Sequence, residues 1–243
     1  MGRKSRRNRM NPKEQDPQGS GTPRASGISR RGIVIGSVSA LLLALVAGIA
    51  LYKGGEPQSP GLVDASSQAA LVSDHSPTLG DESARVHIVE FLDPACETCA
   101  QFFPLVKQWM AENPGRIRLS VRHVAFHDGS DYVVRLLEAS RRQDKYWQTL
   151  EALLASQAMW APHHTVRQDL VGQAIAGVGL DVGQLMADMN APEVAERIQR
   201  DRNAAIALKV TATPEYFVNG RPMPSFGQQQ LQALVSEALQ SAY

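Results

Sequence analysis

The chain has 243 residues, with 25 basic and 24 acidic side chains and a formal net charge of +1. This length allows one or two domains, and a count of only two cysteines excludes a small scaffold held together by several disulfides. The charge is unevenly distributed, because residues 1–31 hold nine Lys and Arg against two acidic residues.

An apolar and uncharged run follows Arg30 and Arg31 directly: residues 32–52, GIVIGSVSALLLALVAGIALY. About 20 apolar residues are needed to cross a bilayer core, and positive residues before a span keep that end in the cytoplasm. The apolar region of a cleaved signal peptide is shorter, about 7–15 residues. We therefore predict a single transmembrane signal-anchor over 32–52 and a basic, disordered cytoplasmic tail over 1–31 that binds no nucleic acid.

The next segment is rich in Gly, Pro and Ser, which favours a linker. We expect this linker to occupy residues 53–75 and one folded domain to occupy residues 76–243, a length that supports a single core.

The expected elements of this domain come in the order strand, helix, strand, block of helices, hairpin and helix. Their residue ranges are 85–92, 99–113, 116–126, about 130–208, 215–223 and 227–243. The strands are indicated by a buried apolar run and by alternation of charged and apolar residues, and the hairpin by its Asn-Gly turn. The order predicts an α/β layer with an all-helical insertion over about 130–208.

Both cysteines lie in one stretch, residues 89–104, VEFLDPACETCAQFFP. A structural metal site needs about four ligands, and the six histidines are scattered, with His163 and His164 expected in a surface loop. Two buried core cysteines would be the simplest alternative. A redox pair has a clearer mechanism, because a helix N-terminus stabilises the thiolate of Cys96 and Cys99 lies one helical turn away. Disulfide chemistry also persists outside the cytoplasm.

From about Ser76 to Tyr243 the chain resembles the DsbA-like branch of the thioredoxin superfamily, especially its membrane-anchored bacterial members similar to BdbD. Four features carry the resemblance: the lead-in GDESARVHIVEFLDPACETC, the proline at position 104, the position of the helical block, and the segment TATPEYFVNGRPM. The resemblance implies an α/β thioredoxin fold with an inserted all-helical domain, preceded by one transmembrane helix. It also implies a protein thiol-disulfide oxidoreductase in the bacterial cytoplasmic (inner) membrane, with the catalytic domain in the periplasm.

The resemblance also implies roles for individual residues. Cys96 would be the exposed nucleophile and Cys99 the buried resolving thiol, so the redox-active disulfide would be the only cofactor and no metal is expected. Pro214 would be a cis-proline, and the backbone of Thr213 would bind an extended substrate peptide; an ordinary turn proline is the alternative. Glu90 would be a buried acid that relays a proton, unless it reaches solvent at the end of its strand.

The dipeptide between the cysteines, Glu97 and Thr98, departs from the Pro-His found in strong oxidants of this family. A carboxylate at Glu97 repels a thiolate, whereas Thr98 can donate a hydrogen bond to sulfur, so the net effect on the Cys96 pKa is open. For Asp93 we expect either a helix cap or a position near the thiols.

Three functional hypotheses follow. The first is an oxidase that donates its disulfide to exported cysteine-containing proteins and is reoxidised by a DsbB- or VKOR-like membrane partner. The second is a reductase or isomerase kept reduced by a DsbD- or CcdA-like donor, for example serving cytochrome c or copper-site thiols. The third is non-enzymatic: a copper metallochaperone that binds through Cys96 and Cys99, or a holdase.

Overall fold

The structure is a computed structural model that describes residues 64–71 and 73–243. The predicted tail 1–31 and the predicted membrane span 32–52 lie outside these residues. Within the described part, no helix combines the length and the apolar character needed to cross a membrane.

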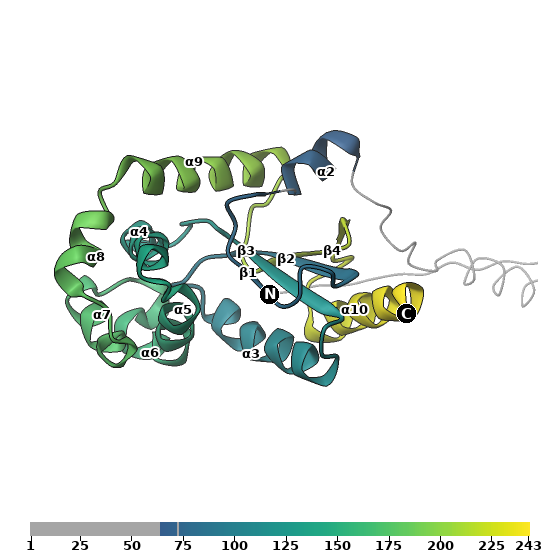
Figure 1. The fold of residues 1–243 in the computed structure, drawn as a ribbon, viewed down its shortest axis with the longest axis horizontal. Helices are drawn as coiled ribbons and strands as arrows, with labels where there is room; N and C mark the ends of the chain where they lie inside the picture. Colours follow the sequence, from purple (N-terminus) through teal and green to yellow (C-terminus); the bar gives the residue numbers. More distant parts are fainter. Residues whose placement is uncertain (1–63, 72) are drawn as a thin grey trace, which may run out of the picture. The chain divides into compact units, whose positions relative to one another are not determined.

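A five-stranded sheet forms the centre of the domain (Figure 1). Its strands, in the order β1-β3-β2-β4-β5, are Thr78–Leu79, Ile117–His123, Val86–Leu92, Glu215–Val218 and Arg221–Pro222. Strands β2 and β3 are parallel, and every other pair is antiparallel. Parallel neighbours require a crossover connection, which is supplied here by the helix between β2 and β3.

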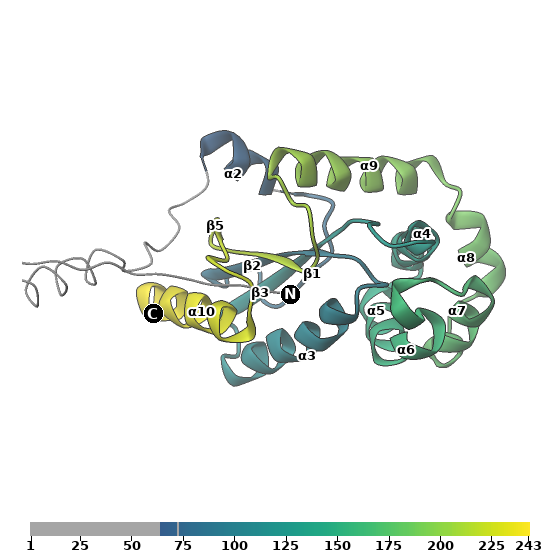
Figure 2. The same ribbon diagram turned by 180° about the vertical axis from the view of Figure 1, so that it is seen from behind.

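Helices cover both faces of this sheet (Figures 1 and 2). The crossover helix α3 (Glu97–Glu112) and the last helix α10 (Gln228–Ala242) lie against one face. Helices α2 (Ala65–Leu71) and α9 (Pro192–Ala207) lie over the other face. Each face therefore has its own apolar core, and the core beneath α3 continues into the helical insertion.

Strand β2 shows why the sequence pattern there is almost continuously apolar. Val86 and Ile88 belong to the core on the α3 side, whereas Val89 and Phe91 belong to the core on the α9 side. Successive side chains of a strand point to opposite faces, and here both faces are covered. The exception is Glu90, a fully buried carboxyl group on the α3 side of the strand.

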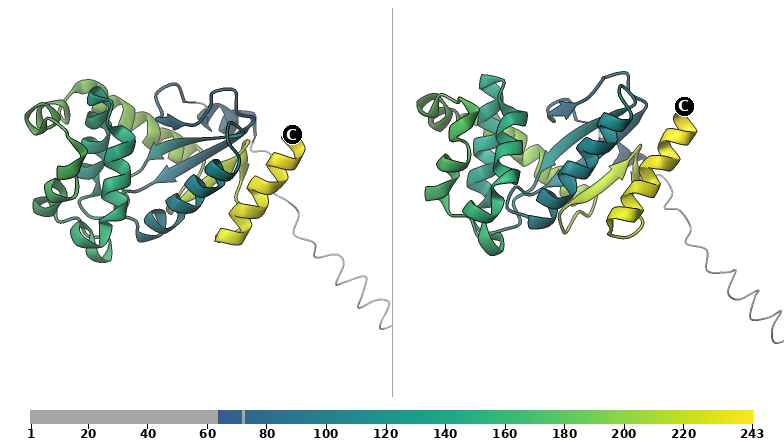
Figure 3. Two further views of the ribbon diagram at one scale, coloured as in Figure 1. Left: turned by 60° about the horizontal axis from the view of Figure 1, so that its bottom comes forward. Right: turned by 90° about the horizontal axis from the view of Figure 1, so that it is seen from below.

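The helical insertion lies beside the sheet (Figure 3) and confirms the prediction for residues 130–208. Its helices are α4 (Ser130–Ser140), α5 (Tyr146–Ala155), α6 (Gln157–Trp160), α7 (Gln168–Ala174), α8 (Val182–Asp188) and α9. The predicted hairpin is also present: Asn219 and Gly220 join β4 to β5, and both have the positive φ values that such a turn requires.

The predicted linker 53–75 differs from the structure at its C-terminal end. Residues 65–71 form helix α2, which contacts α9, and Leu71 is buried in the core on that side of the sheet. The folded domain thus begins before residue 76. A short helix with one buried anchor produces only a weak apolar pattern in the sequence, so the flanking Gly, Pro and Ser dominated the prediction.

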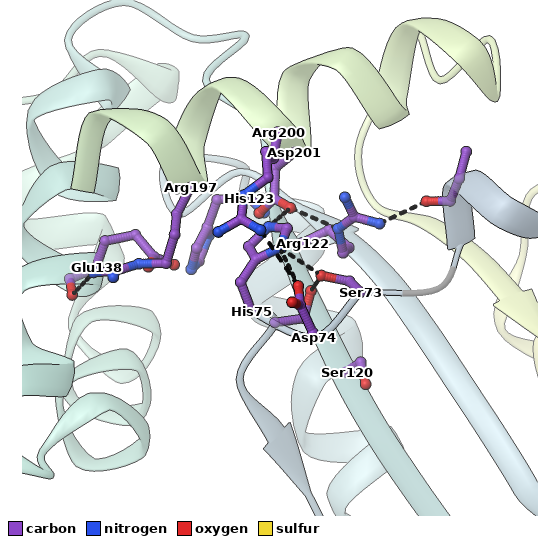
Figure 4. Close-up of polar contacts among 12 residues, drawn as sticks. Ser73, Asp74, His75, Ser120, Arg122, His123, Glu138, Arg197, Arg200 and Asp201 are labelled. Atoms are coloured by element: carbon purple, nitrogen blue, oxygen red, sulfur yellow. Dashed lines mark hydrogen bonds and ion pairs between the residues drawn. The ribbon is translucent and has the colours of Figure 1, made fainter. Parts of the chain in front are cut away.

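A buried cluster of charged residues fastens the segment after α2 to the domain (Figure 4). Asp201 of α9 accepts a hydrogen bond from Arg122 Nε at 2.6 Å, and its carboxylate lies 2.8 Å from His75 Nε2. The second carboxylate oxygen accepts from the backbone N–H of His123 at 2.9 Å. The side chains of Arg122 and Asp201 are only 3% and 2% exposed. Burial acts to raise the pKa of Asp201, but its hydrogen bond with His75 and the charge of Arg122 hold that pKa below its usual value.

We predict that Asp201→Ala lowers the free energy of unfolding by about 3–5 kcal/mol, because it leaves the Arg122 guanidinium buried without its partner. Chemical denaturation measures this loss. The native pKa of Asp201 is lowered, so its stabilisation is present above the unfolded-state pKa and is lost as the pH falls through the native value. The matched control is Asp74→Ala, since the Asp74 side chain is 89% exposed and its ion pair with Arg200 should contribute at most about 1 kcal/mol. Equal effects of the two substitutions would contradict the prediction.

Candidate functional site

The two cysteines lie at the junction between β2 and α3. Cys96 is the N-cap residue of α3, with extended backbone angles, and Cys99 lies in the first turn of the helix. Both are free thiols in this structure. The backbone N–H groups of the first helical turn have no partners within the helix and point toward its N-terminus, so they face the sulfur of Cys96.

The residue Cys96 is only 3% exposed, which differs from the expectation of an exposed nucleophile. The reason is the loop that precedes β4: the Cys96 thiol donates a hydrogen bond to the Thr213 carbonyl oxygen at 3.2 Å. The peptide bond between Thr213 and Pro214 is cis, as the sequence predicted. The structure thus brings together the two segments that the sequence placed more than a hundred residues apart.

The pKa of Cys96 is lowered from about 9 to about 5. The largest cause is a hydrogen bond from the Cys99 side chain, which outweighs the opposing effect of burial. The Thr213 hydroxyl, which is buried without a partner in this structure, adds a further donor for the thiolate. Hydrogen bonds from the backbone N–H groups of Cys99 and Thr98 also lower the Cys96 pKa. Cys96 is therefore a thiolate at neutral pH, and its hydrogen bond to the Thr213 carbonyl oxygen belongs to the protonated thiol.

Cys99 behaves in the opposite way. Burial raises its pKa well above the usual value, and its hydrogen bond to Cys96 and the charges of Glu90 and Cys96 act in the same direction. At neutral pH the pair therefore consists of one thiolate, at Cys96, and one protonated thiol, at Cys99. This division suits an attacking and a resolving group in disulfide exchange.

Glu90 lies beneath the thiols on β2. Burial raises its pKa to about 8; the Tyr216 hydroxyl opposes part of this rise, and the charge of Cys96 adds to it. Tyr216 is the direct cross-strand neighbour of Glu90 on β4. Within the described residues, the two carboxyl oxygens of Glu90 have no hydrogen-bond partner of good geometry. The same is true of the Tyr216 hydroxyl. Glu90 is thus a neutral carboxylic acid near pH 7, held in a place where it can give or take a proton.

The dipeptide between the cysteines affects Cys96 less than its composition suggests. The Glu97 side chain is exposed to solvent and is not among the main causes of the shift in the Cys96 pKa. Thr98 contributes through its backbone N–H. In this structure the helix N-terminus and Cys99 therefore outweigh the side chains of the dipeptide.

Asp93 is not the helix cap that was one of its two expected roles. Its fully buried carboxylate accepts hydrogen bonds from the N–H of Ala95 at 2.8 Å and from the N–H groups of Phe126 and His127 at 2.6 and 3.0 Å. The Ser130 hydroxyl donates to it at 3.1 Å. Asp93 thus joins the turn before Cys96 to the loop that enters the helical insertion.

The insertion also holds the active-site turn through two residues that the sequence did not single out. The Gln157 side-chain amide donates to the carbonyl oxygens of Pro94 and Cys96 at 2.7 and 2.9 Å. His164 Nδ1 lies 3.3 Å from the carbonyl oxygen of Ala95. His164 was expected in a surface loop, but its half-buried ring stacks on His127 with ring centres 4.6 Å apart. Neither a lone glutamine nor a His pair carries a sequence signal for such contacts.

Within the described residues, no group of three or more His, Cys, Asp or Glu side chains is arranged to hold a metal ion.

We predict that titration of the reduced protein, followed by the ultraviolet absorbance of the thiolate, gives a Cys96 pKa of about 5. Cys99→Ser keeps a hydrogen-bond donor to the sulfur and should keep this pKa well below 9, whereas Cys99→Ala removes the donor and should raise it. The same pKa in both variants would contradict the assigned role of Cys99. Because the native pKa is lowered, the reduced protein should lose stability relative to the oxidised protein as the pH falls from about 9 through about 5.

Comparisons with known proteins place this chain in a family. The family model described as Thioredoxin matches residues 73–237, more than half of the chain. Among the structures similar to this one, a thioredoxin-like oxidoreductase from Silicibacter pomeroyi DSS-3 has a TM-score of 0.62 and 30% identity, over 73% of this chain and 99% of that chain. Oxidised BdbD from Bacillus subtilis has a TM-score of 0.60 over 68% of this chain and 94% of that chain, but at 23% identity it shows only the fold.

Curated relatives include proteins of two kinds. A Na(+)/H(+) antiporter NhaA of Herminiimonas arsenicoxydans is 32% identical over 193 residues, or 78% of this chain and 30% of that protein. The chain thus spans less than a third of the length of the antiporter relatives. The thiol:disulfide interchange protein DsbA of Bordetella parapertussis is 26% identical over 162 residues, or 63% of this chain and 73% of that protein. The probable disulfide bond formation protein D of Bacillus anthracis is 27% identical over 153 residues, or 59% and 69%. The chain therefore belongs to the thioredoxin family.

Proposed function

We propose that this protein is a thiol oxidase, which donates its Cys96–Cys99 disulfide to cysteine-containing proteins outside the cytoplasm. The observation that carries the proposal is the lowered pKa of Cys96 beside the raised pKa of Cys99. Stabilising the thiolate stabilises the reduced form of the enzyme, and a stabilised reduced form makes the corresponding disulfide a stronger oxidant.

The reaction begins from the oxidised enzyme. A substrate thiolate attacks the sulfur of Cys96, which forms a mixed disulfide and releases Cys99. The second thiol of the substrate, as its thiolate, then attacks the substrate sulfur of the mixed disulfide and releases Cys96 as a thiolate. The substrate dithiol has lost two electrons and two protons: the reduced enzyme holds both electrons, one proton ends on Cys99, and the other goes to solvent because Cys96 stays a thiolate.

Glu90 would supply the proton that Cys99 needs. A buried thiolate at Cys99 is unfavourable, as the raised pKa of that thiol shows. The carboxyl group of Glu90 is protonated below a pH of about 8 and interacts electrostatically with both cysteines. Transfer of its proton to the departing sulfur avoids the buried charge, and the same group would take a proton back when the disulfide re-forms.

The loop of Thr213 and Pro214 would hold the substrate. The Thr213 carbonyl oxygen already accepts a hydrogen bond from Cys96 in this structure. An extended polypeptide can pair with the exposed edge of such a segment through its own backbone, which would place a substrate cysteine next to Cys96 without selecting a particular sequence.

A location outside the cytoplasm agrees with the sequence. The uncharged run 32–52 after a basic arm would hold the chain as a single-pass protein of the bacterial cytoplasmic membrane, with its N-terminus inside and the domain in the periplasm. Relatives named as a thiol:disulfide interchange protein and as a probable disulfide bond formation protein fit this assignment. Under this proposal, a quinone-linked membrane protein of the DsbB or VKOR type reoxidises the enzyme.

We predict that rapid thiol trapping in the native envelope finds the pair of Cys96 and Cys99 mostly oxidised. The stabilised Cys96 thiolate favours transfer of the disulfide to substrates, and the membrane partner restores it. A mostly reduced pair would contradict the oxidase and support the reductase. In parallel, Cys99→Ser should accumulate mixed disulfides with substrate proteins, because the resolving thiol is absent. Cys96→Ser is the matched control and should accumulate none.

We also predict that Glu90→Gln slows reduction of the disulfide by substrate thiols at least about tenfold, because the amide cannot transfer a proton. Stopped-flow kinetics measure the rate. Since burial raises the pKa of Glu90 from 4.5 to about 8, wild-type stability should fall relative to the Gln variant as the pH rises between these values. Glu112→Gln, on an exposed residue at the end of α3, is the control and should change neither property. An unchanged rate in Glu90→Gln would remove Glu90 from the mechanism.

A further inference from the structure

A polar cavity lies on the opposite face of the sheet from the thiols. Its volume is about 390 Å³, and it is bordered by α2, by strands β1, β2 and β3, and by the turn between β4 and β5. Helix α9 covers the rest of this face, where Phe91 is buried. The cavity is therefore at the end of the sheet where His87 and Arg118 lie, away from the catalytic turn.

Arg118 is the cationic side chain of this cavity. It is the direct cross-strand neighbour of His87, so both side chains are on the same face of the sheet. Its Nε is buried and has no hydrogen-bond partner, and Arg118 forms no ion pair with any described residue. By contrast, Arg122 and Arg197, whose side chains are 3% and 16% exposed, each have a carboxylate partner: Arg122 has Asp201, and Arg197 has Glu138.

The described residues around this cavity place no carboxylate in its lining. No Asp or Glu is among the residues that line the cavity. The remaining polar groups are hydroxyls, amides and one imidazole, all of which can donate hydrogen bonds. Asn219 uses its side-chain oxygen to accept from the backbone N–H of His87 at 2.7 Å, which leaves its amide N–H groups as donors.

His87 adds a donor when its ring is protonated. The Thr78 hydroxyl donates to the Ser76 carbonyl oxygen at 3.3 Å and lies 2.7 Å from the Ser120 hydroxyl, so Ser120 donates to Thr78. Ser120 then accepts from His87 Nε2–H at 2.8 Å, and Nδ1 of the neutral imidazole carries no proton. The imidazole is neutral at pH 7 because burial and then the nearby Arg118 charge lower the pKa of His87 to about 4. A bound anion would reverse both the charge imbalance and this shift.

We propose that this cavity is a binding site for a small oxyanion, a phosphate or carboxylate group held by the guanidinium of Arg118, with the Asn219 amide and the protonated His87 imidazole as further donors. A planar guanidinium matches the paired oxygens of either group, and the volume lies in the range of about 300–1,000 Å³ that is typical of small-molecule sites. This site is independent of the proposed oxidase function, because none of its residues contacts the cysteines.

The test is nuclear magnetic resonance of the His87 imidazole in the full chain, titrated with acid in the absence and presence of millimolar inorganic phosphate or succinate. Without anion, His87 should titrate at about 4. With the bound anion, its pKa should rise by at least about one unit, which corresponds to about tenfold tighter binding of the anion to the protonated imidazole. A response to phosphate but not to succinate identifies a phosphate site, and the converse identifies a carboxylate site.

The matched variants are Arg118→Gln and Arg116→Gln. The first removes the guanidinium of the cavity and should abolish the response to the anion. The second removes an exposed arginine that packs on the Tyr243 ring outside the cavity and should leave the response intact. The wild-type titration does not depend on how well either variant folds. No shift of His87 with either anion overturns the proposal, and so does an equal shift in Arg118→Gln.

Discussion

The site depends on the hydrogen bonds that stabilise a negative charge on the sulfur of Cys96. A helix begins at this residue, so unpaired backbone N–H groups face the sulfur and favour the thiolate. The Cys99 side chain adds the strongest hydrogen bond. The same burial that leaves Cys99 protonated keeps Glu90 protonated below it. The Cys96 thiolate thus lies next to two protonated groups, the Cys99 thiol and the Glu90 carboxyl. This arrangement allows a proton to be transferred during disulfide exchange.

The helical insertion is part of this arrangement, because it supplies the contacts that fix the turn before α3. Gln157 and His164 face three successive carbonyl oxygens, from Pro94 to Cys96. Asp93 completes the connection by accepting hydrogen bonds from backbone N–H groups of the loop that follows β3. Since a shift of the turn would move Cys96 relative to Thr213, the geometry of the thiol depends on contacts with residues more than 30 positions away in the chain.

The sheet separates two polar environments. On the α3 side, Glu90 is buried among apolar residues without a hydrogen-bond partner, which is unfavourable for stability but provides a proton donor. On the other side, buried Arg122 is neutralised by Asp201, and the segment around His75 is attached through the same carboxylate. Arg118, also on β3, has no such carboxylate among the residues that the structure describes. The contrast between these two arginines of one strand distinguishes a structural ion pair from a candidate binding site.

The sequence by itself determined the order of elements, the place of the helical insertion, the cysteine pair at a helix start and the cis-proline segment. These features depend on local periodicity, on turn residues and on motifs, which are readable in order along the chain. Only the tertiary structure decided how the dipeptide Glu97-Thr98 affects the thiolate, that Asp93 is a buried junction, and that residues 65–75 belong to the domain. It also revealed Gln157, His164 and the cavity at Arg118. The physical reason is that burial and hydrogen-bond partners set the pKa of a group and the position of a turn, and these partners come from distant parts of the chain.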